Sequence, residues 1–403
     1  MANSLIAPPE ALRLVLSRVR PLELEAVPLA QALGRVLGEP LASGDDVPPF
    51  DSSAMDGFAV RAEDTRGARA DAPLELRLAG ESRAGSPAER GPEAREAVRI
   101  STGAMLPPGA DAVVRVEDTA ERDGIVEVHA EVAPGREVRR AGEDVAAGEQ
   151  VLGAGGALGA AELAVAASVG AAELRCHRRP SVSILVTGDE LVEPGRALAP
   201  GQIRNTNGIA IEALARDAGA AVDGHTTVGD DYRATVEALA SSLEADVAIT
   251  TGGVSVGAHD HVKPALAELG VDEVFWGVAL RPGKPTWFGT RGRTLVFGLP
   301  GNPVSAMVTF RLFARPALMA LQGAETRSRR AQAVIDEDYK KHPGRAHVVR
   351  CRLDARDDGW HVRPTKAQGS HVLTSMLNAE ALAYLEVERG DVRAGERVEI
   401  EIL

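Results

Sequence analysis

Hydrophobic and polar positions change their spacing several times along the chain. Near the start, Pro8 and Pro9 precede an i, i+3, i+4, i+7 stripe of Leu12, Val15, Leu16 and Val19. This spacing predicts an amphipathic helix that opens at the prolines and ends at Pro21.

The next stretch, from Val47 to about Val138, has short β-prone runs separated by Gly/Pro turns: Phe58–Val60, Ala112–Val116 and Ile125–Val128. It predicts a small β-rich domain. The Gly- and Ala-rich stretch Val151–Leu174 then carries a helical period, at Leu158, Leu163, Ala166 and Val169. We interpret it as a linker-like subdomain that closes back on the N-terminal helix.

After Pro180 the pattern alternates between uninterrupted apolar runs and helix-period segments. Strands are expected at Val182–Val186, Ala221–His225, Val247–Thr250 and Thr294–Gly298, and helices at Ile209–Asp217, Tyr232–Leu243 and from Pro303 onward. Continuous apolar strands between helices predict a parallel sheet covered on both faces. Pro316 should kink or end the last helix.

From Ala331 the pattern returns to short strands, at Val348–Leu353, Ala381–Val387 and Arg397–Ile402, with turns at Gly359, Gly390 and Gly395. We expect a small C-terminal β-barrel.

Composition narrows the class of protein. The length of 403 residues fits two to four domains, and 45 Lys+Arg against 58 Asp+Glu give a net charge of −13. That balance argues against nucleic-acid and anionic-membrane partners, so an anionic substrate needs a local basic cluster. The two distant cysteines, Cys176 and Cys351, exclude a disulfide framework and fit a reducing compartment. The start lacks a signal-peptide pattern and no apolar run approaches about 18 residues, so we expect a cytoplasmic protein.

Four loops near the expected strands carry residues suited to ligand binding or catalysis: Thr187–Glu190, Val228–Asp231, Thr250–Gly257 and Gly298–Pro303. Three of them follow a strand directly, and Val228–Asp231 lies between a strand and its helix. Ligands of open α/β sheets bind beyond the carboxyl ends of the strands. Glycine amides at such a position form an anion cradle. Each loop alone also fits an ordinary turn, and Asn302-Pro303 an ordinary helix start. Ala258-His259 stands where a phosphate-binding P-loop needs Lys-Ser/Thr.

Charged residues at this rim come in two groups. Glu190, Asp230 and Asp260 are hard oxygen ligands of the kind that Mg²⁺ uses beside phosphates, although Asp230 also fits a helix cap. In the turn Leu280–Pro285, two cations, Arg281 and Lys284, are held between prolines and suit an oxyanion. The alternative is a solvated turn.

The β-rich stretch carries polar segments without a period: Pro48–Phe58, Ser101–Ala104 and Arg139–Asp144. Functional loops are favoured for the first two, whereas the arginine pair also fits a charged surface turn. His259 and His261 lack the spacing of a zinc site, and no Gly-x-Ser-x-Gly nucleophile elbow follows a strand.

Together these motifs closely resemble those of the molybdopterin molybdenumtransferase family, to which the C-terminal domain of gephyrin belongs. The matching segments span about residues 5 to 403 and are Asp51–Val60, Thr187–Glu190, Thr251–Gly257 with Asp260, Arg281–Pro285 and Gly298–Ala306. The resemblance implies insertion of molybdate into adenylylated molybdopterin with release of AMP, a Mg²⁺ requirement and a homodimer.

The resemblance also implies a multidomain α/β plus β architecture. Its expected parts are an elongated split subdomain (1–46 and 145–178), a β-rich insertion domain (47–144), a central doubly wound molybdopterin-binding α/β domain (179–327) and a C-terminal small β-barrel (328–403). The implied cleft lies between the α/β and barrel domains of one subunit and the β-rich insertion of the other.

Site roles are implied residue by residue. The substrate phosphates would be held by Gly252, Gly253, Ser255, Pro300 and Asn302. Mg²⁺ and AMP release would involve Glu190, Asp230 and Asp260, and the insertion and its edge would supply Asp56, Thr102, Arg139 and Asp144. Molybdate would be met by Arg281, Lys284, Arg345 and Ser370. Some family members carry lysine at the positions of Gly277 and Arg281, so the resemblance leaves the cation count at the oxyanion site open; arginine at 281 keeps the charge but changes its geometry.

Two other functions share parts of this pattern. A molybdopterin adenylyltransferase would share the α/β domain but needs neither the barrel nor the Arg281–Pro285 turn. A gephyrin-like scaffold role could coexist with the fold, although Glu190, Asp230 and Asp260 favour catalysis. Molybdate and tungstate are both tetrahedral dianions of nearly equal size, and the sequence does not distinguish them.

Overall fold

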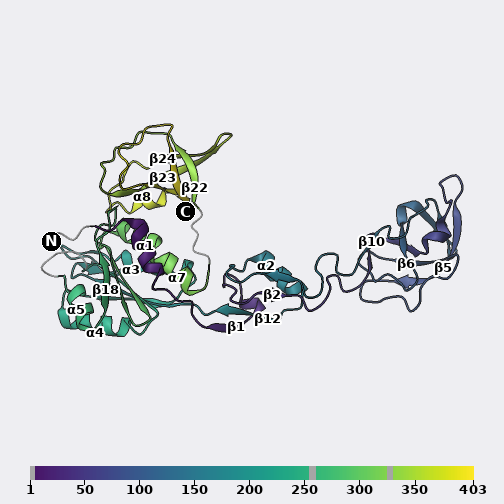
Figure 1. Cartoon of the computed structure of the whole chain (residues 1–403), viewed down its shortest axis with the longest axis horizontal. Helices are drawn as coiled ribbons and strands as arrows, with labels where there is room; N and C mark the ends of the chain where they lie inside the picture. The colour runs from purple at the N-terminus through teal and green to yellow at the C-terminus, as the bar shows by residue number, and fades with distance from the viewer. Residues whose placement is uncertain (1–4, 254–259, 325–329) are drawn as a thin grey trace.

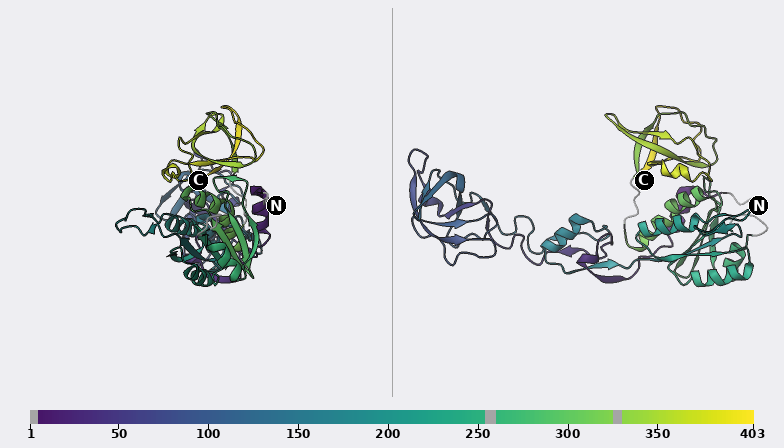
Figure 2. Two further views of the ribbon diagram at one scale, coloured as in Figure 1. Left: turned by 90° about the vertical axis from the view of Figure 1, so that its left-hand side faces the viewer. Right: turned by 180° about the vertical axis from the view of Figure 1, so that it is seen from behind.

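The computed structural model describes residues 5–253, 260–324 and 330–403. The molecule is elongated: an α/β domain and a barrel lie at one end, and a narrow arm leads to a β-rich domain at the other (Figure 1). The view from behind shows the same separation between the two ends (Figure 2).

The α/β domain is built on one six-stranded sheet. In spatial order its strands are β16 (Ala221–Val228), β13 (Ser181–Thr187), β17 (Val247–Thr251), β21 (Thr294–Leu299), β20 (Trp287–Arg291) and β18 (Asp272–Trp276). The first four are parallel, as predicted. The last two are antiparallel and were not predicted. A tight turn at Gly292, where φ is +58°, joins β20 to β21 and makes their antiparallel pairing possible.

Helices cover both faces of this sheet, which confirms the doubly wound expectation. One face carries α1 (Pro8–Leu16), α3 (Asn207–Asp217), α6 (Pro303–Thr309) and α7 (Arg315–Leu321), and the other carries α4 (Tyr232–Ser242) and α5 (Val262–Glu268). Neighbouring positions of β13 show the alternation: Ile184 belongs to the core of the first face and Leu185 to that of the second.

The helix that begins at Pro303 does not end near Pro316. A wider π-turn, Phe310–Ala314, joins α6 to α7, and Pro316 lies in the first turn of α7. Proline lacks an N–H donor and clashes with the carbonyl four residues earlier in a regular helix, so the irregular turn accommodates it. The helical stretch Pro303–Leu321 thus continues for 19 residues and is apolar and long enough to cross a membrane, contrary to the sequence expectation, but 61% of its apolar window is buried inside the protein.

The N-terminal helix packs on the α/β domain, contrary to expectation. Ala11 and Val15 are fully buried against the core of that domain, and α1 contacts α7. The segment after residue 150 closes instead on residues 24–42. There β1 (Leu24–Pro28) pairs with β12 (Glu173–His177), and β2 (Leu41–Ala42) pairs with β11 (Gln150–Leu152). With α2 (Ala160–Ser168), these strands form the arm.

The β-rich domain is confirmed. Its sheet has the order β7 (Ala112–Arg115), β4 (Gly57–Val60), β6 (Glu96–Ile100), β5 (Leu74–Ser82), β9 (Ile125–Val128) and β8 (Thr119–Arg122). At the edge towards the arm, β3 (Ser52–Ser53) pairs with β10 (Val138–Arg139).

The C-terminal barrel is also confirmed. It closes because β23 pairs at both ends of the order β23 (Ala346–Arg356), β24 (Gly359–Pro364), β22 (Arg330–Ile335), β26 (Arg397–Ile402) and β25 (Ala381–Leu385). A short strand, β19 (Leu280–Arg281), leaves the α/β domain and pairs in parallel with β23. This pairing joins the two domains beside the predicted site.

Candidate active site

The glycine rim lies at the carboxyl end of β17. Gly252 and Gly253 have φ angles of +87° and +61°, a backbone conformation that side chains rarely adopt. A Cβ atom on Gly252 would lie 2.6 Å from the backbone oxygen of Thr187 at the end of β13. Glycine is therefore required for the close approach of two strand ends. The predicted substrate residue Ser255 lies outside the described residues.

A cavity of about 570 Å³ opens at this rim. The ends of β13, β17 and β21 and the start of α6 form its wall. The structure thereby brings together four predicted residues: Glu190, Gly252, Pro300 and Asn302. They come from three separate loops, as expected for strand ends at one edge of a sheet.

Asn302 occupies the N-cap position of α6, and Pro303 follows as its first residue. These positions are the ones that the helix-start alternative gave, but in the described structure the Asn302 side chain makes no capping hydrogen bond. Asn302 instead lines the rim cavity and a second cavity beside it.

The second cavity, of about 360 Å³, gathers the predicted molybdate residues Arg281, Lys284, Arg345 and Ser370. Two contacts between domains bring them together. Leu280 and Arg281 pair with Ala346 and His347 of the barrel, and the Val304 amide donates to the Ser370 carbonyl oxygen at 3.1 Å. Because Pro285, Asn302, Ser305 and His371 line both cavities, we refer to them together as the double cavity.

Sequence reasoning missed Arg350, which is fully buried on β23 beside the loop of Ser370. Its Nη2 donates to the carbonyl oxygens of Ala367, at 3.3 Å, and Gly369, at 3.4 Å. Its Nε and Nη1 have no hydrogen-bond partner among the described residues. Burial lowers the pKa of Arg350. A buried cation without a carboxylate partner is costly, so this site favours an anion. Its only sequence signal is a charge within an apolar strand.

The pKa of His347 reflects the positive charge around the second cavity. It is 5% exposed, and burial together with the charges of Arg281, Lys341 and Arg345 lowers its pKa from 6.5 to about 4. The histidine is therefore neutral at neutral pH.

Asn207 and Arg204 are two further lining residues that the sequence did not single out. Asn207 is buried, and its Nδ2 donates to Thr251 Oγ1 at 2.9 Å and to the Gly301 carbonyl oxygen at 2.8 Å. Its Oδ1 and the Nη1 of Arg204 lack partners within the described part of the chain. The wall thus offers an acceptor and a cationic donor. Both precede Ile209, where the sequence pattern predicted the start of a helix, and no signal marked them.

The three predicted metal carboxylates do not form a ready-made metal cage. Asp260 lies next to the glycine rim, because a Cβ on Gly253 would be 3.4 Å from its Oδ1. Asp230 is exposed, and its amide donates to Asp189 Oδ1 at 2.9 Å. In residues 5–253, 260–324 and 330–403, no three His, Cys, Asp or Glu side chains come together as a metal site.

The helix-cap alternative for Asp230 is wrong. The N-cap of α4 is Asp231, whose side chain accepts from the Ala234 amide at 2.8 Å.

The remaining predicted residues lie far from the double cavity. Asp56 Oδ1 accepts from the Thr102 amide at 2.7 Å and from Thr102 Oγ1 at 3.1 Å, and these hydrogen bonds lower the pKa of Asp56. Arg139 lies on β10, and Asp144 is exposed on the segment that leads back to the arm. Asp56, Thr102 and Arg139 belong to the β-rich domain, at the opposite end of the molecule (Figure 1).

A doubly wound domain with an anion-cradling rim, joined to a barrel that adds positive charge, defines an enzyme that handles a phosphorylated substrate and a small oxyanion. Comparison with known proteins agrees. Residues 6–170 match the family described as the MoeA N-terminal region (domain I and II), residues 183–320 a probable molybdopterin binding domain, and residues 332–403 the MoeA C-terminal region (domain IV).

Named relatives cover nearly the whole chain. The molybdopterin molybdenumtransferase of Haemophilus influenzae is 39% identical over 94% of both chains. Molybdopterin molybdenumtransferase 2 of Mycobacterium tuberculosis is 39% identical over 96% of this chain and 97% of its own. The solved molybdopterin biosynthesis MoeA protein of Pyrococcus horikoshii matches 99% of this chain and 100% of its own, with 31% identity and a TM-score of 0.85. The chain belongs to the molybdopterin molybdenumtransferase family and is a transferase of molybdenum cofactor biosynthesis.

Proposed function

We propose that this enzyme inserts molybdate into adenylylated molybdopterin and releases AMP, in the cytoplasm. The observation that carries the proposal is the double cavity, where a glycine rim suited to phosphates adjoins a cavity lined by Arg281, Lys284 and Arg345. A phosphorylated substrate and a tetrahedral dianion could occupy the two parts side by side. Holding two reactants in contact contributes much of the rate enhancement in group transfer.

Two groups of residues, one at the glycine rim and one around the cations, bind the two reactants. Amides at Gly252 and Gly253, with Pro300 and Asn302, bind the phosphates of the substrate. Arg281, Lys284, Arg345 and Ser370 bind molybdate, and the buried guanidinium of Arg350, which donates to the carbonyl oxygen of Gly369 in the cavity wall, adds positive charge behind them. A dianion offsets the mutual repulsion of these cations and the cost of burying Arg350.

Mg²⁺ fits the carboxylates at the rim only in part. Glu190 lines the cavity and Asp260 lies beside Gly253, and both offer the oxygen ligands that Mg²⁺ prefers. Mg²⁺ usually takes one or two protein carboxylates and completes its shell with phosphate oxygens and water, so no three-carboxylate cage is needed. Bound there with Glu190, Asp260 and Asp230 as candidate ligands, it would neutralise charge on the phosphates.

We further propose a homodimer in which each double cavity is completed by the β-rich domain of the other chain. The Asp56–Thr102 pair faces solvent at the far end of the arm. Around it lie exposed apolar side chains: Met55 at 40%, Met105 at 40% and Val116 at 51%. Such a patch beside charged residues suits contact with protein. In the proposed homodimer, this patch contacts the double cavity of the second copy of the chain.

Reconstitution tests the activity. Purified protein, adenylylated molybdopterin, Mg²⁺ and molybdate should yield AMP and a cofactor that activates a cofactor-free molybdenum enzyme. Asp260→Asn should bind the substrate but release AMP roughly 100-fold more slowly in a single turnover. No AMP release by the wild type would refute the reaction, and unchanged release by the variant would remove Asp260 from it.

Complementation tests the shared site. Asp56→Ala and Asp260→Asn each disable every site in their own homodimers, whereas a heterodimer of the two regains one intact site if the chains share it. Verified heterodimers of folded variants should therefore recover about half of the wild-type activity. Recovery of none would place the whole site in one chain.

A further inference from the structure

We infer that Arg178, remote from the double cavity and from Asp56, is a positioning residue: it clamps the root of the arm to the α/β domain and so sets where the β-rich domain points. The inference rests on the proposed shared site, since only there does the direction of the arm matter for catalysis.

Two segments connect the arm to the α/β domain, just before β1 and just after β12. Beyond the root they pair over five residues, from Leu24↔His177 to Pro28↔Glu173, as an antiparallel ribbon. A ladder of backbone hydrogen bonds resists bending within the ribbon. Any change in the direction of the arm is therefore concentrated at the root, residues 20–23 and 178–181.

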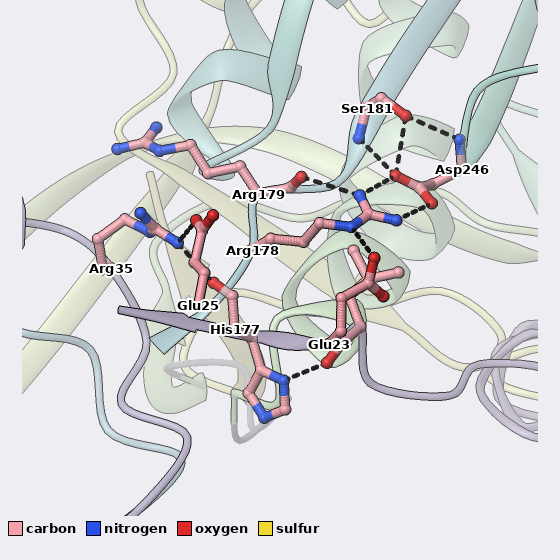
Figure 3. A network of polar contacts seen from close by, with 9 residues as sticks. Glu23, Glu25, Arg35, His177, Arg178, Arg179, Ser181 and Asp246 are labelled. Atoms are coloured by element: carbon pink, nitrogen blue, oxygen red, sulfur yellow. Dashed lines mark hydrogen bonds and ion pairs between the residues drawn. The ribbon is translucent and has the colours of Figure 1, made fainter. Parts of the chain in front are cut away.

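Arg178 joins both connecting segments to the sheet (Figure 3). Its Nη1 and Nη2 donate to Asp246 Oδ2 and Oδ1 at 2.6 and 2.7 Å, and its Nε donates to Glu23 Oε1 at 2.6 Å. Asp246 directly precedes β17, Glu23 lies on the first connecting segment and Arg178 on the second. One guanidinium thus binds all three elements. Planar two-point contacts of this kind fix orientation as well as distance.

Asp246, the partner of Arg178 beside the sheet, is held in place by further hydrogen bonds. Asp246 Oδ2 also accepts from the Ser181 amide and from Ser181 Oγ, both at 2.8 Å. Burial opposes ionisation of Asp246, but the hydrogen bonds from Arg178 and Ser181 outweigh it and hold the pKa of Asp246 below its usual value. The Asp246 side chain is 17% exposed and that of Arg178 31%, so water screens the pair less than a surface pair.

Several further contacts hold parts of the root, each joining two of its elements. A cavity of about 540 Å³ lies there, lined largely by polar and charged groups that include Arg18, Arg20 and Arg293. The further contacts include hydrogen bonds from the Leu22 amide to the Leu321 carbonyl oxygen at 2.8 Å, from the Arg178 amide to the Glu23 carbonyl oxygen at 3.0 Å and between His177 Nδ1 and the Leu22 carbonyl oxygen at 2.5 Å. Leu22, 5% exposed, packs in the core of the α/β domain. Arg178 is the side chain that ties both connecting segments and the sheet together, so we expect its loss to loosen the angle of the root. Because the arm is long, a small rotation at its root moves Asp56 far.

Distance measurements between two spin labels test the clamp directly. Ala120→Cys on the β-rich domain and Glu237→Cys on α4 provide exposed labelling sites, and the native Cys176 and Cys351 are buried. Labelled chains diluted with unlabelled protein report distances within one chain. Arg178→Ala should broaden the distribution severalfold, and Arg178→Lys, which keeps the charge but loses the two-point contact, should broaden it less.

Arg356→Ala is the matched control. Arg356 also binds two carboxylates, Asp336 and Asp354, but all three lie in the barrel. It should leave the distribution and the activity unchanged. Arg178→Ala should lower kcat at least tenfold with little change in the KM for molybdate, because the molybdate cavity is untouched, and Arg178→Lys should be intermediate.

An unchanged distance distribution in Arg178→Ala would overturn the clamp. A broadened distribution with wild-type kcat would overturn the positioning role. Since the distances are measured without substrate and the shared site is tested by complementation, failure of the clamp and failure of the proposed function give different results.

Discussion

Protonation of His347 should destabilise the fold as the pH falls from about 6.5 to 4. Burial and three neighbouring cations lower its pKa from 6.5 to about 4. Between these values the unfolded chain binds a proton at this position that the folded chain does not. Stability therefore falls with falling pH in this window, and the contribution of His347 levels off below it.

The size of the effect follows from the shift. One pKa unit corresponds to about 1.4 kcal/mol, so a shift of this size costs about 3 kcal/mol of folding free energy between pH 7 and pH 4. That is a sizeable part of the stability of an ordinary domain. Because His347 is only 5% exposed, screening by solvent removes little of it.

The matched variant is His347→Gln, which keeps a polar group opposite the Tyr339 hydroxyl, 3.2 Å from Nδ1 in the wild type, but takes no proton. Urea unfolding of both proteins from pH 7 to pH 4 isolates the histidine, since other titrating groups cancel in the difference. The wild type should lose about 3 kcal/mol more than the variant. Saturating molybdate should raise the pKa of His347, visible in its NMR titration, because a dianion offsets the surrounding charges.

Parallel pH dependences of the two proteins would refute the reasoning about burial and charge at His347. A molybdate-independent titration of its imidazole, with molybdate binding demonstrated separately, would instead show that the dianion lies away from Arg281 and Arg345.

Three other predictions address the rim and the cation cluster. Lys284→Ala should raise the molybdate concentration for half-maximal rate about ten- to a hundredfold, the scale of one charge-assisted contact, with substrate binding almost unchanged; failure of excess molybdate to rescue the rate would assign Lys284 to the nucleotide instead. Gly252→Ala, whose Cβ would lie 2.6 Å from a backbone oxygen, should weaken substrate binding more than tenfold, whereas Gly270→Ala, with φ +74° but open space, should lower stability by only about 1–2 kcal/mol; equal binding by the two variants would contradict the close approach at the rim. Asp231→Ala should cost about 1 kcal/mol of stability through the lost cap of α4 and Asp230→Ala under about 0.5 kcal/mol, measured by urea unfolding; the reverse order would restore the cap to Asp230.

Much of the α/β core was predictable because its signals are local. A strand such as β13 is a run of mostly apolar, β-prone residues. The glycines at 252 and 253 indicate a turn regardless of where the strand before them lies in the sheet. Strand ends of a parallel sheet meet at one edge, so the loops at Glu190 and Asn302 could be placed together before their distances were known.

Errors arose where a local rule had more than one structural solution. Pro316 was expected to kink or end a helix, and the helix instead continues past it through an irregular π-turn. Asp230 and Asp231 are adjacent acids before one helix, and the pattern alone does not say which one caps it. In each case neighbouring packing chose between alternatives of similar energy.

The sequence by itself determined most of the elements, the order of the domains and the set of motifs, because each depends on residues close together in the chain. Only the tertiary structure decided that β19 joins the barrel and brings Arg281 to Arg345, that Arg350 is buried beside them, and that Asp56 lies at the far end of an arm. Those relations depend on pairing and packing between segments tens to hundreds of residues apart. Such contacts form where surfaces are complementary in three dimensions, and no period in the chain records them.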